Sequence, residues 1–185
     1  WADNRSASIA TEIKDSTQGK LIYEQTGTPI HAMSPLSKIV WLKEHRPSLF
    51  TEIHRFISIK EYIWYKLFGV YEVDYSIASA TGLFQIKSLS WNTDSLKLCG
   101  IKAEQLSKPV PPDHVRKISD ESLIHSLSID TDTPIYIGSS DGCMANIGSF
   151  AIEPGTAALT IGTSGAIRVS NSKPVFNFKA MTFTY

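Results

Sequence analysis

The chain is poor in cysteine, has no surplus of either charge and contains no long apolar run. Its 185 residues include two cysteines, Cys99 and Cys143, which lie far apart and show no metal-binding spacing. Two reduced thiols are therefore expected rather than a disulfide. Lys plus Arg and Asp plus Glu number 18 each, so the net charge indicates no nucleic-acid or lipid partner. An anionic ligand must instead be held by local groups such as loop amides, helix ends or a metal.

Several common site motifs are also missing. The chain has no GxxxxGK[ST] loop, HExxH or CxxC, which argues against three familiar enzyme classes. No apolar stretch approaches the about 20 residues that cross a bilayer, and the opening residues WADNRSAS do not resemble a signal peptide. We therefore expect a cytoplasmic protein with no membrane partner. Because an initiator methionine is missing, we also expect a piece of a longer gene product.

What is present indicates a packed α/β protein. Apolar residues make up 42% of the chain, enough for a core. Apolar spacing predicts a helix at Ser34-Pro35 whose buried face is formed by Leu36, Ile39, Val40 and the Trp41 ring. It also predicts a later helix with Tyr62, Ile63 and Leu67 at helical spacing. The remaining predictions are helices over 4–25, 59–68 (the one with Tyr62), 94–99 and 119–127, extended segments at 71–75 and 83–86, and a proline-rich connector at 108–112.

The pattern changes near Phe150. After this point a hairpin of residues 157–161 with 166–170 is expected, with no partner strands in the sequence. A lone two-stranded hairpin is marginal in water. We therefore expect residues 1–150 to form a mixed α/β region and residues 151–185 to open a second domain.

A single acidic residue, Asp141, stands at a strand-to-helix junction in the sequence IYIGSSDGCMANIG. One interpretation is a helix cap that accepts N–H groups of the first turn. The other is a catalytic carboxylate that orients a substrate hydroxyl and accepts its proton late in phosphoryl transfer. The spacing alone favours neither interpretation.

A glycine- and hydroxyl-rich loop follows about twenty residues later. A short apolar run is followed directly by Gly162, Thr163 and Ser164. Their amides and hydroxyls could donate to phosphate oxygens. The same composition is ordinary for a hairpin turn, and the pattern alone favours the turn.

Two further clusters have the groups that a sugar site needs. Asp74-Tyr75 precedes a stretch of small and hydroxyl-bearing residues, and Trp1, Asp3 and Arg5 combine an aromatic ring with two opposite charges. Aromatic faces and charged forks bind sugars. The alternatives are a capped strand end for the first cluster and a frayed terminus for the second.

Five motifs in order resemble the FGGY family of carbohydrate kinases. They are the segment 33–45 (MSPLSKIVWLKEH), the Trp-x-Asp-x-Arg of residues 1–5, the Asp-Tyr-x-x-Ala-Ser of residues 74–79, the Gly-Ser-Ser-Asp of residues 138–141 and the Gly-Thr-Ser of residues 162–164. The segments 28–31, 33–36 and 58–62 look most like the gluconate-specific members. The resemblance covers nearly the whole chain.

This resemblance implies an α/β, actin-like (ribonuclease H-like) fold, of which the chain holds the second half of the N-terminal domain and the first strands of the C-terminal domain. Asp141 would be the general base and would hold Mg²⁺ through water. Trp1, Asp3, Asp74 and Tyr75 would line the sugar site, with Gly162, Thr163 and Ser164 on the phosphates of ATP. The implied reaction makes 6-phosphogluconate from gluconate and ATP.

The sequence also departs from the family pattern. The family's N-terminal Asp-x-Gly-Thr/Ser hairpin and its later adenine-binding glycines have no counterpart here, so we expect an internal fragment without activity of its own. Alternatives are a xylulose- or glycerol-type kinase of the same family and a non-catalytic sugar-binding, actin-like domain. A sugar-acid or polyol substrate and ATP are the expected partners, and a homodimer stays open.

Overall fold

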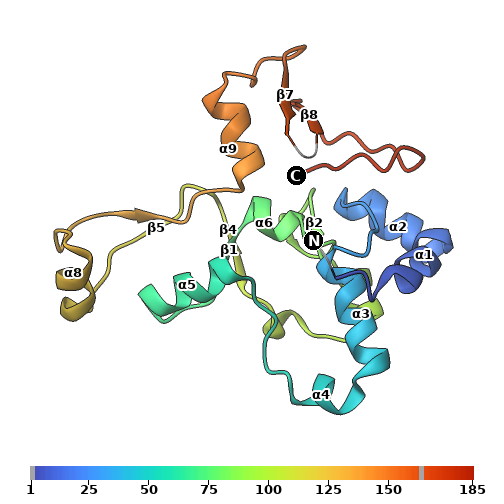
Figure 1. Cartoon of the computed structure of the whole chain (residues 1–185), viewed down its shortest axis with the longest axis horizontal. Coiled ribbons are helices and arrows are strands. Elements are labelled where there is room, and N and C mark those ends of the chain that lie inside the picture. Colours follow the sequence, from blue (N-terminus) through green and yellow to red (C-terminus); the bar gives the residue numbers. More distant parts are fainter. Residues whose placement is uncertain (1–2, 163–164) are drawn as a thin grey trace.

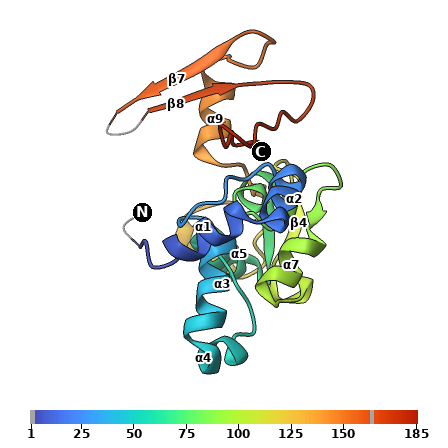
Figure 2. The ribbon, with the colours of Figure 1, turned by 90° about the vertical axis from the view of Figure 1, so that its right-hand side faces the viewer.

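The computed structural model of the chain describes residues 3–162 and 165–185. Helices α1 to α3 form a compact body, and α9 and the β7–β8 hairpin stand on one side of it (Figures 1 and 2). The helices are α1 (Ala7–Asp15), α2 (Thr17–Thr26), α3 (Pro35–His45), α4 (Pro47–Glu52), α5 (Ile59–Phe68), α6 (Tyr75–Ser79), α7 (Thr93–Cys99), α8 (Glu121–Leu127) and α9 (Asp141–Gly148). The strands are β1 (Glu72–Asp74), β2 (Phe84–Gln85), β3 (Ser90–Trp91), β4 (Lys108–Val110), β5 (Val115–Arg116), β6 (Ile135–Tyr136), β7 (Ala157–Ile161) and β8 (Gly165–Val169).

The first predicted helix is two helices that meet at Ser16. The Ser16 hydroxyl accepts the Gly19 N–H at 2.9 Å and donates to the Ile13 carbonyl at 2.7 Å, so it caps α2 and closes α1. A side chain at Gly19 would lie 1.8 Å from the Ile13 carbonyl oxygen. The single helix predicted over 4–25 is therefore wrong at its centre, because a serine hydroxyl competes with the helical backbone. Gly27, at φ 68°, ends α2, close to the predicted end of the helix at residue 25.

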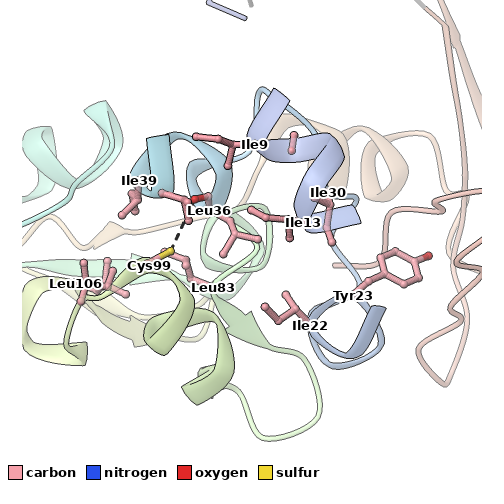
Figure 3. Close-up of a cluster of buried hydrophobic side chains, with 13 residues drawn as sticks. Ile9, Ile13, Ile22, Tyr23, Ile30, Leu36, Ile39, Leu83, Cys99 and Leu106 are labelled. Carbon is pink, nitrogen blue, oxygen red and sulfur yellow. Dashed lines mark hydrogen bonds between the residues drawn. The ribbon is translucent and has the colours of Figure 1, made fainter. Parts of the chain in front are cut away.

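The main core lies between α1, α2, α3 and α7. Leu36, Ile39 and Val40 of α3 are buried as predicted, whereas Trp41 is half-buried against the core. They pack with other apolar side chains from these helices and from the segments before β2 and β4 (Figure 3): Ile9, Ile13, Ile22, Tyr23, Leu83, Cys99 and Leu106. Burial raises the pKa of the Cys99 thiol to about 12, so this thiol stays protonated. Cys99 and Cys143 are both free, as the sequence indicated.

Helix α5 has the predicted bounds, but the apolar residues at helical spacing do not form its most buried face. Ser58 and Glu61 form a capping box at its start, and Gly69 ends it at φ 68°. Its apolar residues Tyr62 and Ile63 face outward, whereas Trp64 is buried against Val110 and Ile137. The orientation follows from Trp64, because its indole N–H donates to the Glu72 carboxylate at 3.0 Å.

Strands β1 and β4 pair in parallel, with Glu72 opposite Lys108 and Asp74 opposite Val110. The connector predicted at 108–112 is therefore wrong at its start, because residues 108–110 form a strand. The pairing joins residues that are far apart in the sequence. Pro109 is compatible with a strand at the edge of a sheet, because the missing N–H of a proline is not needed on an unpaired side. After Asp74 the chain turns directly into α6, so Tyr75 belongs to a helix.

The predicted hairpin is present as β7 and β8, with Ala157 opposite Val169 and Ile161 opposite Gly165. It stands above α9 (Figure 2), and the Ser170 hydroxyl donates to the Ala151 carbonyl at 3.0 Å. The segment after β8 returns to α2, where the Tyr23 hydroxyl donates to the Thr182 carbonyl at 2.8 Å. Within residues 3–162 and 165–185, none of the helices has the length and apolarity that crossing a membrane demands.

A buried charge cluster joins α5, β1 and β5. The Glu72 side chain is 4% exposed, and Arg116 donates to its two oxygens from Nε and Nη2, each at 2.7 Å. His114 Nε2 lies 3.0 Å from Glu72 Oε2, which also accepts the Trp64 N–H. Hydrogen bonding to Arg116 is the largest cause that lowers the pKa of Glu72 to about 2. This cluster fixes the edge of the strand that leads to Asp74.

Substituting Glu72→Gln should lower the free energy of unfolding by about 2 kcal/mol, because Arg116 and Trp64 lose a buried charged partner. The expected loss of free energy of unfolding is smaller than for a fully buried ion pair, because Arg116 is one-third exposed. Urea denaturation measures the change. The matched control is Asp132→Asn, which removes the exposed Lys117–Asp132 ion pair and should leave stability unchanged. Equal effects of the two substitutions would show that the buried Glu72 cluster stabilises the fold no more than the exposed Lys117–Asp132 ion pair does.

The contribution of Glu72 should also depend on pH. Its pKa is lower in the folded state, so ionisation stabilises the fold above the unfolded pKa, near 4.5. That stabilisation is lost as the pH falls from about 4.5 through about 2. The stability gap between the unsubstituted chain and Glu72→Gln should therefore shrink by more than half between pH 6 and pH 3. An unchanged gap at pH 3 would show that the carboxyl is not stabilised in its ionised form.

Candidate active site around Asp141

Asp141 is the first residue of α9 and its side chain is exposed. Ser140 is the N-cap, and its hydroxyl accepts the Cys143 N–H at 3.4 Å. Among the described residues, Asp141 Oδ1 accepts only the adjacent Gly142 N–H, at 2.7 Å. The N-cap is therefore Ser140, and Asp141 accepts one N–H of the first turn without being the cap residue. The Asp141 carboxylate stays open to a ligand at the start of the helix.

A chain of hydrogen bonds connects this helix start to β1. The Ser76 hydroxyl donates to Asp74 Oδ1, and it accepts the Ser139 hydroxyl at 2.8 Å and the Ser140 N–H at 2.7 Å. Ser76 is 7% exposed, so these bonds lie in a dry environment. One buried hydroxyl thus ties the loop before Asp141 to the end of β1.

Asp74 anchors the other end of this chain. Its side chain is fully buried, and Oδ1 also accepts the N–H groups of Ser76 and Ile77 at 3.0 and 3.1 Å. Oδ2 accepts from Lys60 Nζ at 2.5 Å. Both oxygens are thus occupied by protein groups. The Ser76 hydroxyl bridges Asp74 and the loop before Asp141. The contact of Asp74 with the sugar stays a prediction.

The other predicted sugar residues lie in two places. Tyr75 is half-buried at the start of α6, with its ring centroid 5.7 Å from that of Phe84. Asp3 accepts from Arg5 Nε and Nη2 at 2.9 and 2.8 Å, which holds the pKa of Asp3 well below its usual range. Trp1 lies outside the described residues.

Arg5 forms one wall of a pocket of about 190 Å³ between the start of the chain and α3. Its guanidinium lies 4.6 Å above the Trp41 ring, in cation–π geometry. The pocket is lined by Asp3, Arg5, Ser6, Lys38, Trp41 and Leu42. Among the described residues, no hydrogen bond connects this pocket with Asp141.

The hairpin places a second group beside Asp141. Gly162 is exposed at the end of β7, and Thr163 and Ser164 lie outside the described residues. On β8, Arg168 Nε lies 2.9 Å from the point that a Cβ at Gly142 would occupy. Sequence reasoning missed Arg168 and Ser76. For Ser76 a signal exists, because a serine two residues after an aspartate is common in helix caps. No local pattern singles out Arg168.

Comparison with known proteins identifies the class. Residues 1–148 match the N-terminal domain of the FGGY family of carbohydrate kinases. The chain is 44% identical over all 185 residues to a gluconokinase from Bacillus subtilis, of which it spans 36%. The crystal structure of gluconate kinase from Lactobacillus acidophilus matches with a TM-score of 0.89 and 40% identity, covering 95% of this chain and 36% of that one. A ligand-bound xylulose kinase from the same organism gives 0.86 and 40%, covering 91% and 34%.

The fold is thus α/β and forms part of the actin-like fold of sugar kinases. The chain belongs to the FGGY family of carbohydrate kinases. Among the members it matches, it resembles gluconate kinases over its whole length. It spans about a third of the length of these relatives.

Substituting Ser76→Ala should destabilise the protein by about 1–3 kcal/mol, because the buried Asp74 oxygen and the Ser140 N–H each lose a partner. Amide exchange at Ser140 should also become faster. The matched control is Ser122→Ala in α8, where the serine donates to Asp120 in the same kind of cap but lies exposed. That change should have almost no effect. If exchange at Ser140 stays as slow as before, Ser76 does not hold this loop.

Proposed function

We propose that the complete protein carrying this chain is a cytoplasmic kinase that transfers the γ-phosphoryl group of ATP to the terminal hydroxyl of gluconate. The observation that supports it best is the exposed Asp141 carboxylate, held at the start of α9 by the buried Asp74–Ser76–Ser140 chain. The identity of 44% to a gluconokinase supports the choice of substrate. The product is 6-phosphogluconate.

In this proposal Asp141 orients the hydroxyl of the substrate and accepts its proton as the new bond forms. Phosphoryl transfer needs mainly positioning and charge stabilisation, so a firmly held carboxylate suits this role. Ser140 fixes the first turn of α9, and Ser76 fixes Ser140. Trp1, Asp3, Asp74 and Tyr75 are proposed around the sugar.

The groups beside Asp141 fit a phosphate ligand. The Arg168 guanidinium and the hydroxyls of Thr160 and Tyr185 are donors at this place, and phosphate oxygens accept from such groups. Gly162, Thr163 and Ser164 are proposed to contact the phosphates of ATP. Among the described residues no cluster of three metal-binding side chains occurs. Mg²⁺ keeps several waters and needs few carboxylates, so Asp141 acting through water suffices. When bound, Mg²⁺ would neutralise phosphate charge.

We also propose a domain boundary near Phe150, with residues 1–150 in the N-terminal domain and 151–185 in the C-terminal one. The family match ends at residue 148, which supports this position. Phe150 has a positive φ of 57° and is 81% exposed, as expected for a connection between two units.

A xylulose kinase is the second candidate, because a solved enzyme of that name matches with 40% identity. A panel of gluconate, xylulose and glycerol, assayed with coupled detection of ADP, separates the two. Turnover with xylulose that exceeds turnover with gluconate would favour the second candidate.

Substituting Asp141→Asn in the complete protein should lower kcat by about two orders of magnitude or more, because general-base catalysis contributes this much. Binding of gluconate and ATP should change little, since asparagine has nearly the same shape. Steady-state kinetics and calorimetry measure both quantities. Near-normal turnover would remove Asp141 from the mechanism.

The 185-residue chain alone should show no kinase turnover, because the family's first phosphate hairpin has no counterpart in it. Coupled detection of ADP with gluconate and MgATP checks this, and adding the complete enzyme to the same cuvette provides the positive control. ADP production by the purified chain that depends on gluconate would overturn the expectation.

A further inference from the structure

Arg168 comes from the hairpin and lies against the first turn of α9. It is half-buried on β8, and its Nε and Cζ lie 2.9 and 3.4 Å from the point where a Cβ on Gly142 would be. Gly142 directly follows Asp141. The guanidinium is therefore a neighbour of the proposed general base, although the two residues are in different parts of the sequence.

The guanidinium has only neutral partners in the described part of the chain. Nε donates to the Tyr185 hydroxyl and Nη1 to Thr160 Oγ1, both at 3.2 Å. Within the described ranges no carboxylate lies within 4 Å of it, and Nη2 makes no hydrogen bond. Arginine is charged at any physiological pH. A cation with an N–H edge that has no partner in the described ranges thus lies against Gly142, the residue that follows Asp141.

The glycine at position 142 makes this approach possible. Gly142 is buried and helical, and its φ is not positive, so the backbone does not require a glycine here. Alanine is the better helix former. An alanine Cβ, however, would also lie 3.0 Å from the Tyr185 hydroxyl, in addition to its contact with Arg168. The sequence thus has a poor helix former where a side chain would displace the guanidinium.

We propose that Arg168 binds an oxyanion of the reactants next to Asp141: the carboxylate of the sugar acid or a phosphate of ATP. The proposal rests on the proposed kinase function and adds to it a residue of ligand recognition. A guanidinium donates two parallel N–H bonds to either group. Its position on β8 places it on the same hairpin as Gly162, and its contact with Gly142 places it on the side of the base.

The test uses the complete kinase with Arg168→Gln and Arg168→Lys. The glutamine variant should lower kcat/KM for gluconate about 100-fold, because the charged hydrogen bonds are lost. The lysine variant should recover part of this loss, since it keeps the charge without the fork. Calorimetry without turnover identifies the oxyanion. A weaker Kd for gluconate alone assigns the sugar carboxylate, and a weaker Kd for a non-hydrolysable ATP analogue, with ADP unaffected, assigns the γ-phosphate.

Two glycine variants give a matched control that leaves Arg168 itself in place. Gly142→Ala should reproduce the binding defect, because the new methyl group displaces the guanidinium. Gly148→Ala, in the same helix, meets nothing within 4 Å and should leave binding unchanged. If Arg168→Gln fails to fold, the two glycine variants still test whether the position of the guanidinium determines binding.

Binding constants within threefold of the unsubstituted enzyme for Arg168→Gln, or equal effects of the two glycine variants, would overturn the proposal. Asp141→Asn, measured in parallel, reports on the kinase proposal separately. It should lower kcat by about two orders of magnitude or more and retain binding, whereas the Arg168 variants should weaken binding itself.

Discussion

The buried carboxylate of Asp74 is the interaction on which the candidate site depends. A carboxylate without solvent is tolerated only when charged and hydrogen-bonded partners surround it. Asp74 has the Lys60 ammonium, two backbone N–H groups and the Ser76 hydroxyl. Removing any of these partners leaves a charge unsatisfied in the interior. The arrangement therefore holds α5, β1 and α6 in one geometry.

Glu72 adds a second buried carboxylate to the same short strand. Residues two apart on a strand point to the same face, so Glu72 and Asp74 would repel each other without compensation. Each has its own cation, Arg116 for Glu72 and Lys60 for Asp74. Two carboxylates on a three-residue strand thus require one cation from β5, Arg116, and one from α5, Lys60. This requirement explains why α5 points Trp64 inward and leaves Ile63 exposed.

Sequence reasoning located features that are determined by a few neighbouring residues. Gly69 and the Ser34-Pro35 pair end or begin helices where predicted, because caps depend on local backbone geometry. The order of the family motifs identified the fold, and it directed attention to Asp141. The roles of the sugar- and phosphate-binding residues, Trp1 and Thr163 among them, remain predictions.

What the sequence could not predict depends on contacts between distant segments. The pairing of Glu72 with Lys108 is a long-range contact, and composition alone made the second segment look like a connector. The same holds for Ser76, whose local pattern is that of Ser122 in α8. Only the fold distinguishes them, because Ser76 is buried against Ser139 and Ser140, whereas Ser122 is exposed.

The proposed chemistry draws on both sides of the connection between α9 and β7. Asp141 is attached to the N-terminal region through Ser140 and Ser76, whereas Arg168 belongs to the hairpin. In the proposed chemistry, a carboxylate that accepts a proton and a cation that holds an oxyanion act on the same reactants only when α9 and the hairpin are both correctly placed. Gly142 allows Arg168 of the hairpin to approach α9 because it has no side chain. The rigid attachment of Asp141 and the close approach of Arg168 are therefore separate requirements, and a substitution can disturb one while leaving the other intact.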